Sequence, residues 1–428
     1  MIHRHLTEPL LAALGERPVV LLNGARQTGK STLATWLAAG PHPASYLTFD
    51  DARTLAAAQT DPAGFLENLT GPVVLDEIQK APRLLPVIKR SVDRRRAPGR
   101  FLLTGSAEVL LLPQVSESLA GRMEILTLWP LSQGEIDGRR EGFVDALFGT
   151  AALEVPVEPE PWPTLVERLV RGGYPEVVSG GAELRRGAWF DAYLTTILHR
   201  EIRDLSQIEG LTALPRLLDI LAARITGLVN FAELSRSTTL PQTTLKRYMA
   251  ILGLTFIVET LPAWTANLSQ RLVRAPKLLL TDTGLVAHLQ GLAAETLRAR
   301  RDLTGPLLEV FVAMELEKQI GWSRTRPRMF HFRTAAGSEV DLVLEARGGR
   351  LVGVEVKSSA SVSNDDFKAL RLFAEATKKR FHRGVVLYTG SESLRFGPGL
   401  HALPVSAVWR LGAETLPAPA SRSVREGG

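Results

Sequence analysis

One eight-residue segment near the start of the chain restricts the folds open to it more than any other feature. The segment follows the apolar run 19–22 and opens the helix-like stretch 30–39. It reads Gly24-Ala25-Arg26-Gln27-Thr28-Gly29-Lys30-Ser31, with Thr32 next. A strand, a glycine loop and a helix in this order form a P-loop, whose backbone N–H groups and helix N-terminus face phosphates. The segment therefore predicts an α/β domain that binds ATP.

The side chains of this loop have separate tasks in the prediction. Gly24 and Gly29 permit a tight turn, which brings the backbone close to the phosphates. Lys30 should reach the β- and γ-phosphates, and the Ser31 hydroxyl should be a ligand of Mg²⁺. A chance glycine loop is the alternative, but every fixed position of the pattern is present in the expected context.

A second apolar run, 73–75, ends in two carboxylates, Asp76 and Glu77. In a parallel sheet we expect this strand to lie beside the P-loop strand, with its end at the ligand crevice. Asp76 is then placed to hold the hydrated Mg²⁺, and Glu77 to orient and deprotonate the attacking water. The alternative is a surface pair of carboxylates that caps a helix.

Two more candidates follow along the chain. The run 100–103 ends in Thr104-Gly105-Ser106, and a hydroxyl at this strand end, that of Ser106 in particular, could sense the γ-phosphate or place the water. Serine is also a common turn residue. Arg122 could supply the transition-state charge of an arginine finger, in cis or from a neighbouring subunit. An ordinary surface salt bridge is the alternative for Arg122.

Length and composition suggest the organisation of the rest. At 428 residues the chain should form two or three domains. Short apolar runs alternate with helix-like segments up to residue 140, as in a parallel sheet, and 151–163 is a proline-rich linker. We expect an ATPase domain over 1–150, a helical region over 151–300, a mixed α/β domain over 301–413 and a flexible tail over 414–428.

Composition also excludes several classes of protein. The chain has no cysteine, which excludes disulfides, thiolate metal sites and cysteine nucleophiles. No run reaches the roughly 18–20 apolar residues of a membrane span, so we expect a cytoplasmic protein with no membrane partner. The net charge of +6 suits a polyanionic partner such as nucleic acid.

Within the helical region, residues 217–252 have the rhythm of a helix-turn-helix, with a strand pair expected at 256–259 and 272–273. This pattern resembles a winged helix. In a DNA-binding version the polar face of the last helix would meet the groove or its phosphates, through Gln242, Thr243, Thr244, Lys246 and Arg247. A helical unit for protein contacts is the alternative, and nothing indicates base specificity.

The segment 338–359 predicts a hairpin, since two alternating strands flank a short glycine turn. Asp341 lies on its first strand, and Glu355 and Lys357 share one face of its second. Carboxylates so placed can hold one or two hard divalent cations, and a lysine can position the attacking water. The alternative is an edge hairpin whose charges face water.

These motifs resemble known families over nearly the whole chain. The first part resembles AAA-type ATPases, in particular bacterial and archaeal AAA-like ATPases with a C-terminal domain of unknown function. That likeness rests on the segments 24–32, 75–79, 103–106, 118–122, 172–175, 280–285 and 305–358. AAA-type ATPases usually act as rings, so the likeness implies a homo-oligomer, possibly a hexamer.

The hairpin resembles the PD-(D/E)xK nucleases, which have the restriction-endonuclease-like fold. By that likeness Glu309, on a helical run, matches the carboxylate that these nucleases place on their first helix. The metal ligands would be Glu309, Asp341 and Glu355 with Mg²⁺ or Mn²⁺, and the catalytic residues Asp341, Glu355 and Lys357.

Two functions remain open from the sequence. One is an ATP-driven enzyme that acts on DNA and cuts it with a metal-dependent nuclease domain. The other is a non-cleaving, ATP-switched regulator of DNA or protein binding, whose C-terminal domain is a nuclease-like scaffold. A metabolite kinase is disfavoured because no second substrate domain is evident.

Overall fold

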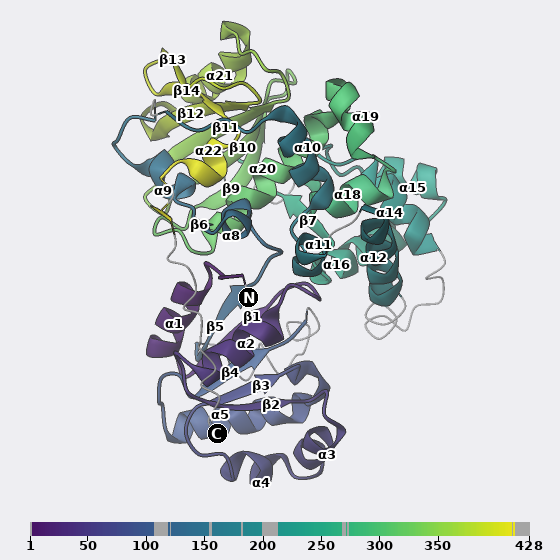
Figure 1. Ribbon diagram of the computed structural model, residues 1–428, viewed down its shortest axis with the longest axis vertical. Coiled ribbons are helices and arrows are strands. Elements are labelled where there is room, and N and C mark those ends of the chain that lie inside the picture. The colour runs from purple at the N-terminus through teal and green to yellow at the C-terminus, as the bar shows by residue number, and fades with distance from the viewer. Residues whose placement is uncertain are drawn as a thin grey trace, which may run out of the picture.

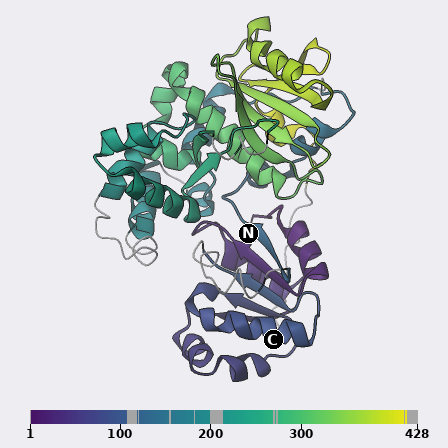
Figure 2. The ribbon, with the colours of Figure 1, turned by 180° about the vertical axis from the view of Figure 1, so that it is seen from behind.

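The computed structural model describes residues 2–106, 119, 121–153, 156–180, 183–198, 213–267, 271, 274–412 and 414–415. The N-terminal domain forms the lower lobe in Figure 1, and the C-terminal sheet and the helical region lie side by side above it. Figure 2 shows the same separation from behind. Within the described ranges, none of the helices combines the length and apolarity that crossing a bilayer requires.

A five-stranded parallel sheet forms the centre of the N-terminal domain, in the order β2-β3-β4-β1-β5. The strands are β1 (Val19–Asn23), β2 (Ser45–Thr48), β3 (Val73–Asp76), β4 (Phe101–Thr104) and β5 (Met123–Thr127). Strands β1, β3 and β4 are buried along their whole length, because helices cover both faces of the sheet. The predicted parallel α/β domain is confirmed.

The covering helices fall into two layers. One layer is α1 (Thr7–Glu16) and α2 (Lys30–Ala39). The other is α3 (Ala52–Thr60), α4 (Pro62–Glu67) and α5 (Leu85–Arg94), with the short helices η1 (Ile78–Lys80) and η2 (Pro82–Leu84).

One expectation about this sheet is wrong. Strand β3, which ends in Asp76, does not lie beside the P-loop strand β1, because β4 pairs with both and separates them. Every connection in a parallel sheet is a crossover, so the order of strands along the chain does not determine their neighbours. The inserted strand brings its own polar end, at Thr104, between the two predicted halves of the site.

The helical region consists of short helices around one small hairpin. Its helices are α10 (Trp162–Arg171), α11 (Pro175–Ser179), α12 (Glu183–Thr196), α14 (Leu214–Ala222), α15 (Phe231–Thr238), α16 (Gln242–Leu254), α18 (Thr283–Leu289) and α19 (Ala294–Ala299). The hairpin pairs β7 (Val258–Leu261) with β8 (Lys277–Leu280). The strand expected at 256–259 thus begins two residues later, and its partner is β8. Residues 272–273, expected as that partner, lie outside the described residues.

The C-terminal domain is built on a six-stranded mixed sheet, in the order β13-β14-β12-β11-β10-β9. Its strands are β9 (Arg328–Arg333), β10 (Glu339–Glu345), β11 (Leu351–Lys357), β12 (Phe381–Tyr388), β13 (Leu394–Gly397) and β14 (Leu400–Pro404). Its helices are η5 (Arg301–Thr304), α20 (Gly305–Ile320), η6 (Asn364–Phe367), α21 (Lys368–Thr377), η7 (Lys378–Arg380) and α22 (Ala407–Arg410). Helix α20 packs on one face of the sheet and α21 on the other, and the predicted hairpin is the antiparallel pair β10–β11.

The segment after β5 contacts the C-terminal domain as well as the N-terminal residues Arg4, His5 and Glu8. Its elements, α8 (Gln133–Asp137), β6 (Arg139–Arg140) and α9 (Phe143–Phe148), contact α20, α22 and β12. The side chains of α9 also join the hydrophobic cluster shared by the helical region and the C-terminal sheet. We therefore propose a domain boundary near residue 128 in place of 150.

The start of the expected flexible tail also needs correction. Residues 414 and 415 form β15 (Glu414–Thr415), which pairs antiparallel with β6. The rest of the predicted tail, 416–428, lies outside the described residues.

Candidate active site

The P-loop joins β1 to α2 through backbone conformations that glycine alone adopts easily. Gly24 has φ +142°, and a Cβ there would lie 2.3 Å from the carbonyl oxygen of Leu128. Gly29 has φ +93° and directly precedes α2. Both positions lie in the left-handed region, so a side chain would strain the loop. Both predicted glycine roles therefore have a geometric basis.

Lys30 lies across the loop that precedes it. Its Nζ donates hydrogen bonds to the carbonyl oxygens of Gly24, at 2.9 Å, and Ala25, at 2.7 Å. The Thr28 hydroxyl donates to the same Ala25 oxygen. The buried ammonium is thus held at the centre of the loop, where a phosphate group would meet it together with the backbone N–H groups.

Asp76 is the most heavily bonded carboxylate of this site. Its Oδ1 accepts hydrogen bonds from the hydroxyls of Ser31, at 3.0 Å, and Thr104. Its Oδ2 accepts one from the Tyr46 hydroxyl at 2.8 Å. Burial and this bond to Asp76 raise the pKa of Tyr46 to about 12, so the phenol keeps its proton. Hydroxyl and carboxylate oxygens are the ligands that Mg²⁺ prefers, so Ser31 and Asp76 fit a Mg²⁺ ion bound with ATP.

Glu77 occupies a strained position next to Asp76. Its backbone has φ +60° and ψ 47°, unusual for a residue with a side chain. Its N–H donates to the Thr104 hydroxyl at 3.1 Å, and its carboxylate accepts from the Gln79 side-chain amide. The same amide donates to Ser106 Oγ at 3.3 Å. The predicted residues Glu77 and Ser106 are thus linked through Gln79.

A cavity of about 280 Å³ lies over the P-loop, and two domains line it. From the N-terminal domain come Arg26, Gln27, Gly29, Lys30, Ser31, Thr32 and Glu77. From the helical region come Tyr193 and Thr196 of α12, with Ile197 directly after them. The sequence does not reveal this second wall, because its residues lie more than 150 positions from the loop.

Arg4 connects the P-loop with residues 129–135, the segment that leads to the upper domains. Its guanidinium donates to the carbonyl oxygens of Thr28 and Trp129, each at 2.6 Å, and to the Glu135 carboxylate at 3.1 Å. Glu135 in turn forms a capping box with Ser132 at the start of α8. Sequence reasoning gave no role to Arg4, Tyr46 or Gln79, because side chains that support a site carry no motif of their own.

Arg122 lies at the opposite edge of the sheet from the nucleotide site. It directly precedes β5, whereas the P-loop follows the carboxyl end of the parallel strand β1. Its guanidinium pairs with Asp93 at 2.6 Å. The geometry therefore does not support Arg122 as a finger acting on its own subunit's nucleotide.

The carboxylates predicted for the C-terminal site do come together. Asp341 and Glu355 are at the same level of the β10–β11 pair, one step beyond the pairing of Leu342 with Val354. Asp341 lies within a register shift of the β9–β10 pairing, between Val340 and Val343. Its Oδ2 accepts a hydrogen bond from the N–H of Val356 at 2.9 Å. We call Glu309, Glu339, Asp341 and Glu355 the acidic cluster. Beside it, Lys357 Nζ lies 3.5 Å from Glu355.

A lysine from the helical region pairs with three acids of this cluster. Lys277 on β8 is 1% exposed, and its Nζ lies 2.6 Å from Glu309 Oε1 and 3.4 Å from Asp341 Oδ1. It also pairs with Glu339. Burial alone lowers the pKa of a lysine, but Glu309 and Asp341 raise the pKa of Lys277 above its ordinary value. The ammonium is therefore charged at every physiological pH.

The pKa values of two acids of the cluster are raised as well, which favours their neutral forms. Burial, reinforced by the charge of Asp341, raises the pKa of Glu309 to about 7. The same two causes raise the pKa of Glu355 well above its usual range. Among the described residues, no group of three or more His, Cys, Asp or Glu side chains could hold a metal ion. The cluster with Lys277 in place thus does not fit the predicted divalent cation.

Three family descriptions match successive parts of the chain. Residues 16–137 match the family described as "AAA domain". Residues 163–296 and 304–408 match two domains of unknown function, DUF8612 and DUF4143. The AAA match covers the sheet, the P-loop and both carboxylates of the nucleotide site.

The comparison with solved structures found several partial matches, all at low identity and with TM-scores below 0.5. They are the Walker-type ATPase PABY2304 of Pyrococcus abyssi (TM-score 0.41, 16% identity, 68% of this chain and 96% of that one), the RuvB Holliday junction branch migration motor of Thermotoga maritima (0.27, 18%, 60% and 89%) and AMPPCP-bound DnaA of Aquifex aeolicus (0.29, 13%, 58% and 86%).

Two curated relatives match nearly the whole chain. They are the uncharacterized proteins Mb2031c of Mycobacterium bovis and Rv2008c of Mycobacterium tuberculosis, each 32% identical over 408 residues, 94% of this chain and 84% of the relative. With its AAA domain and complete P-loop site, this chain is a P-loop ATPase of the AAA type and belongs to the same family as these two mycobacterial proteins.

Proposed function

We propose that this ATPase is a nucleotide-controlled switch that acts on nucleic acid, above all DNA, and that its C-terminal domain is a nuclease-like scaffold that does not cleave. The observation that carries the proposal is the shared wall of the nucleotide cavity. Tyr193, Thr196 and Ile197 of the helical region face the same space as Lys30 and Glu77. A triphosphate bound there contacts both domains and favours the arrangement that fits it better.

The chemistry follows from the side chains of the N-terminal domain. Lys30 and the loop N–H groups bind the phosphates, and Ser31 and Asp76 would hold Mg²⁺, which neutralises phosphate charge when bound. Glu77 takes the proton of the attacking water, while the Gln79 amide, which also donates to Ser106, holds the Glu77 carboxylate in position. Hydrolysis then removes the γ-phosphate from the cavity that α12 helps to line.

Helices α14 to α16 and the β7–β8 hairpin are our candidate winged helix. On α16, Gln242, Thr243, Lys246 and Arg247 are exposed and Thr244 is half-buried. Leu245, Tyr248 and Leu252 of the same helix are buried. The helix therefore offers a polar, positively charged face to the solvent, which suits a phosphate backbone.

DNA binding measured in different nucleotide states tests this function. The affinity for labelled duplex, single-stranded and branched DNA is measured by fluorescence anisotropy. It should differ by about fivefold or more between nucleotide-free protein and protein with Mg²⁺ and a nonhydrolysable ATP analogue. In Lys30→Ala the difference should vanish. If no DNA binds, or if nucleotide changes no affinity, the proposal is wrong and a protein partner becomes the better candidate.

The DNA face is tested separately. The double variant Lys246→Glu/Arg247→Glu should weaken binding to all sequences and reduce the slope of log K against log salt by about two. Arg90→Glu is the matched control, because Arg90 is an exposed arginine of α5 in the other lobe. Equal losses in both variants would place the DNA elsewhere.

A DNA nuclease is the second candidate. It is favoured by one observation, the meeting of Glu309, Asp341, Glu355 and Lys357 from α20, β10 and β11 in the order that PD-(D/E)xK nucleases use. The ammonium of Lys277 disfavours it, since the metal has no place there. Incubation with DNA and Mn²⁺ decides: cleavage that is lost in Asp341→Ala and Lys357→Ala, with ATPase activity retained, would favour the nuclease.

A further inference from the structure

A buried lysine reaches from one domain into the acidic centre of another. Lys277 belongs to β8 of the helical region, whereas its partners Glu309, Glu339 and Asp341 belong to the C-terminal domain. These partners come from helix α20 and strand β10, so the contact joins three elements. A lysine in such a position costs free energy unless its partners compensate for the lost hydration.

Besides the three partners of Lys277, the cluster contains a fourth acid, Glu355, whose Oε2 lies 3.5 Å from Lys357 Nζ. Glu355 is 4% exposed and lies beside Asp341, and its Oε1 has no hydrogen-bond donor among the described residues. A buried carboxylate oxygen without a donor is costly and rare in folded proteins. Carboxylate oxygens are the ligands that a hard divalent cation prefers, so removal of the Lys277 ammonium would leave oxygen ligands at this place.

We propose that the Lys277 ammonium takes the place of a divalent cation in the acidic cluster, so that the C-terminal domain excludes metal while β8 is docked against it. The ammonium neutralises the carboxylates without binding a water molecule for attack on a phosphate. The inference deepens the proposed function, because it gives the physical reason for a nuclease-like scaffold that does not cleave.

The distinction from an ordinary buried ion pair lies in what happens when the lysine is removed. An ordinary pair leaves a single uncompensated carboxylate, which cannot bind a divalent cation tightly. The acidic cluster would leave several carboxylates from three elements around one space. The chain offers a second buried lysine for comparison: Lys318 has a single salt-bridge partner among the described residues, Glu315 at 2.6 Å, and it also donates to the carbonyl oxygen of Leu131.

The test is Mn²⁺ binding by the full chain without nucleotide. Calorimetry measures the affinity, and the melting temperature measures the effect on stability. Wild-type protein should show no binding that depends on Asp341. Lys277→Met should melt lower than wild type in chelator, bind one Mn²⁺ at least about tenfold more tightly than wild type, and recover its melting temperature with Mn²⁺. Lys318→Met should also melt lower but gain no metal binding, and Lys277→Arg should exclude the metal as wild type does.

Two results would overturn the inference. One is a folded Lys277→Met that gains no Mn²⁺ binding. The other needs only folded wild type: Mn²⁺ binding that disappears in Asp341→Asn would show that the lysine does not exclude the metal, even if Lys277→Met fails to fold. Neither result depends on DNA or ATP, so failure here is distinguishable from failure of the nucleotide-controlled switch.

Discussion

Asp76 accepts hydrogen bonds from three hydroxyls that belong to α2, β2 and the end of β4. Three donors fix both oxygens of the carboxylate before any ligand arrives, which is how supporting residues prepare a metal site. Only Ser31 among the donors has a place in the P-loop motif. Tyr46 and Thr104 act through Asp76 and are positioning residues.

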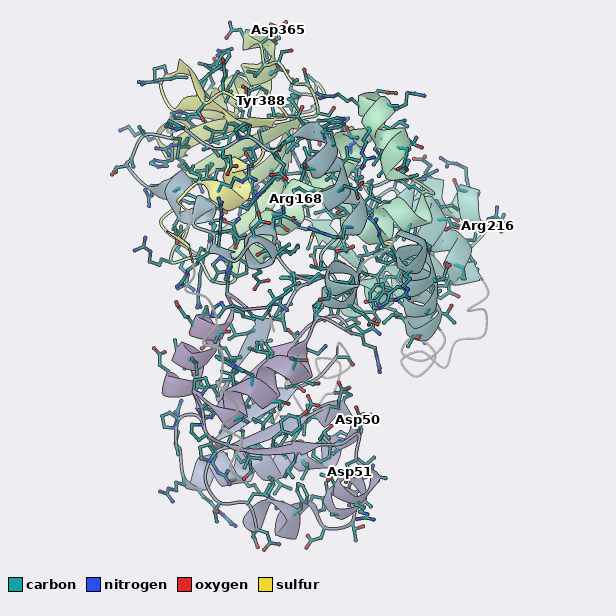
Figure 3. All side chains as sticks on the ribbon, viewed as in Figure 1. Asp50, Asp51, Arg168, Arg216, Asp365 and Tyr388 are labelled. Atoms are coloured by element: carbon teal, nitrogen blue, oxygen red, sulfur yellow. The ribbon has the colours of Figure 1, made fainter. Side chains whose placement is uncertain are left out.

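Tyr46 should therefore influence Mg²⁺ more than turnover. We expect Tyr46→Phe to raise the Mg²⁺ concentration for half-maximal ATPase activity by about tenfold, with little change at saturating Mg²⁺, because Asp76 loses one donor. Steady-state kinetics over a Mg²⁺ series measures this. Tyr388→Phe is the control, since its hydroxyl bonds the backbone of Glu392 in the upper lobe (Figure 3). Equal Mg²⁺ dependence in the two variants would contradict the assignment.

Glu77 should separate binding from hydrolysis. Glu77→Gln keeps the size of the side chain but cannot take a proton, so kcat should fall by about a hundredfold or more while ATP still binds. Calorimetry and phosphate release measure the two properties. Glu67→Gln, which changes an exposed carboxylate at the end of α4, is the control. Near-normal turnover by Glu77→Gln would move the catalytic base elsewhere.

Helix α20 shows what the burial of a whole element does to its charged side chains. It is apolar over most of its surface because it packs between the C-terminal sheet and the helical region. Its few acids lie in buried surroundings, and Glu317 faces Glu259 of β7. Burial, with the nearby charge of Glu259, raises the pKa of Glu317 to about 7.

This shift predicts a pH-dependent stability. The folded pKa is raised above the unfolded value near 4.5, so the folded state retains the proton longer. Glu317 therefore costs stability as pH rises from about 4.5 to 7, and the cost is complete above pH 7. Glu317→Gln should be about 1–3 kcal/mol more stable than wild type at pH 8 and nearly equal at pH 4.5. Denaturant unfolding at both pH values checks this.

The exposed Glu375 of α21 provides the control for that experiment. Glu375→Gln should change stability little at either pH. A gain for Glu317→Gln that does not depend on pH would mean that packing, and not ionisation, causes the effect.

At the scale of the whole molecule, one chain of polar contacts runs between the lobes. Arg4 joins Thr28 of the P-loop to Glu135 of α8, and the N–H of Gln133 in the same helix donates to Glu315 of α20 at 2.8 Å. Arg168 of α10 donates to the Gln133 side chain and lies between the upper lobes in Figure 3. The nucleotide loop and both upper domains thus share one buried network.

The predicted ring gives Arg122 a role that the single chain does not. If Arg122 acts on a neighbour's nucleotide, Arg122→Ala should assemble normally but lose about a thousandfold or more in kcat. Light scattering with and without a nonhydrolysable ATP analogue measures assembly. Mixing Arg122→Ala with Lys30→Ala should restore activity, because each supplies what the other lacks. A monomer that hydrolyses ATP at full rate would contradict both expectations.

How far the sequence could predict this structure depends on the range of the interaction. The strands at 19–22, 73–75 and 100–103, and the hairpin at 338–359, follow from local apolar patterns and turn residues. The strand order β3-β4-β1 could not be predicted, since each crossover is free to skip a position. The partner of β7 was likewise misplaced, because β8 has no turn signal that ties it to β7.

The sequence by itself determined the P-loop, its carboxylate pair and the acids of the C-terminal hairpin, because each is a short pattern whose chemistry lies in neighbouring residues. The tertiary structure alone decided what those groups meet. It brought Thr104 and Tyr46 to Asp76, α12 to the nucleotide cavity and Lys277 to the acidic cluster. The physical reason is that the ionisation and the interactions of a buried charged group depend on the residues around it in space. Packing brings those residues together whatever their distance along the chain.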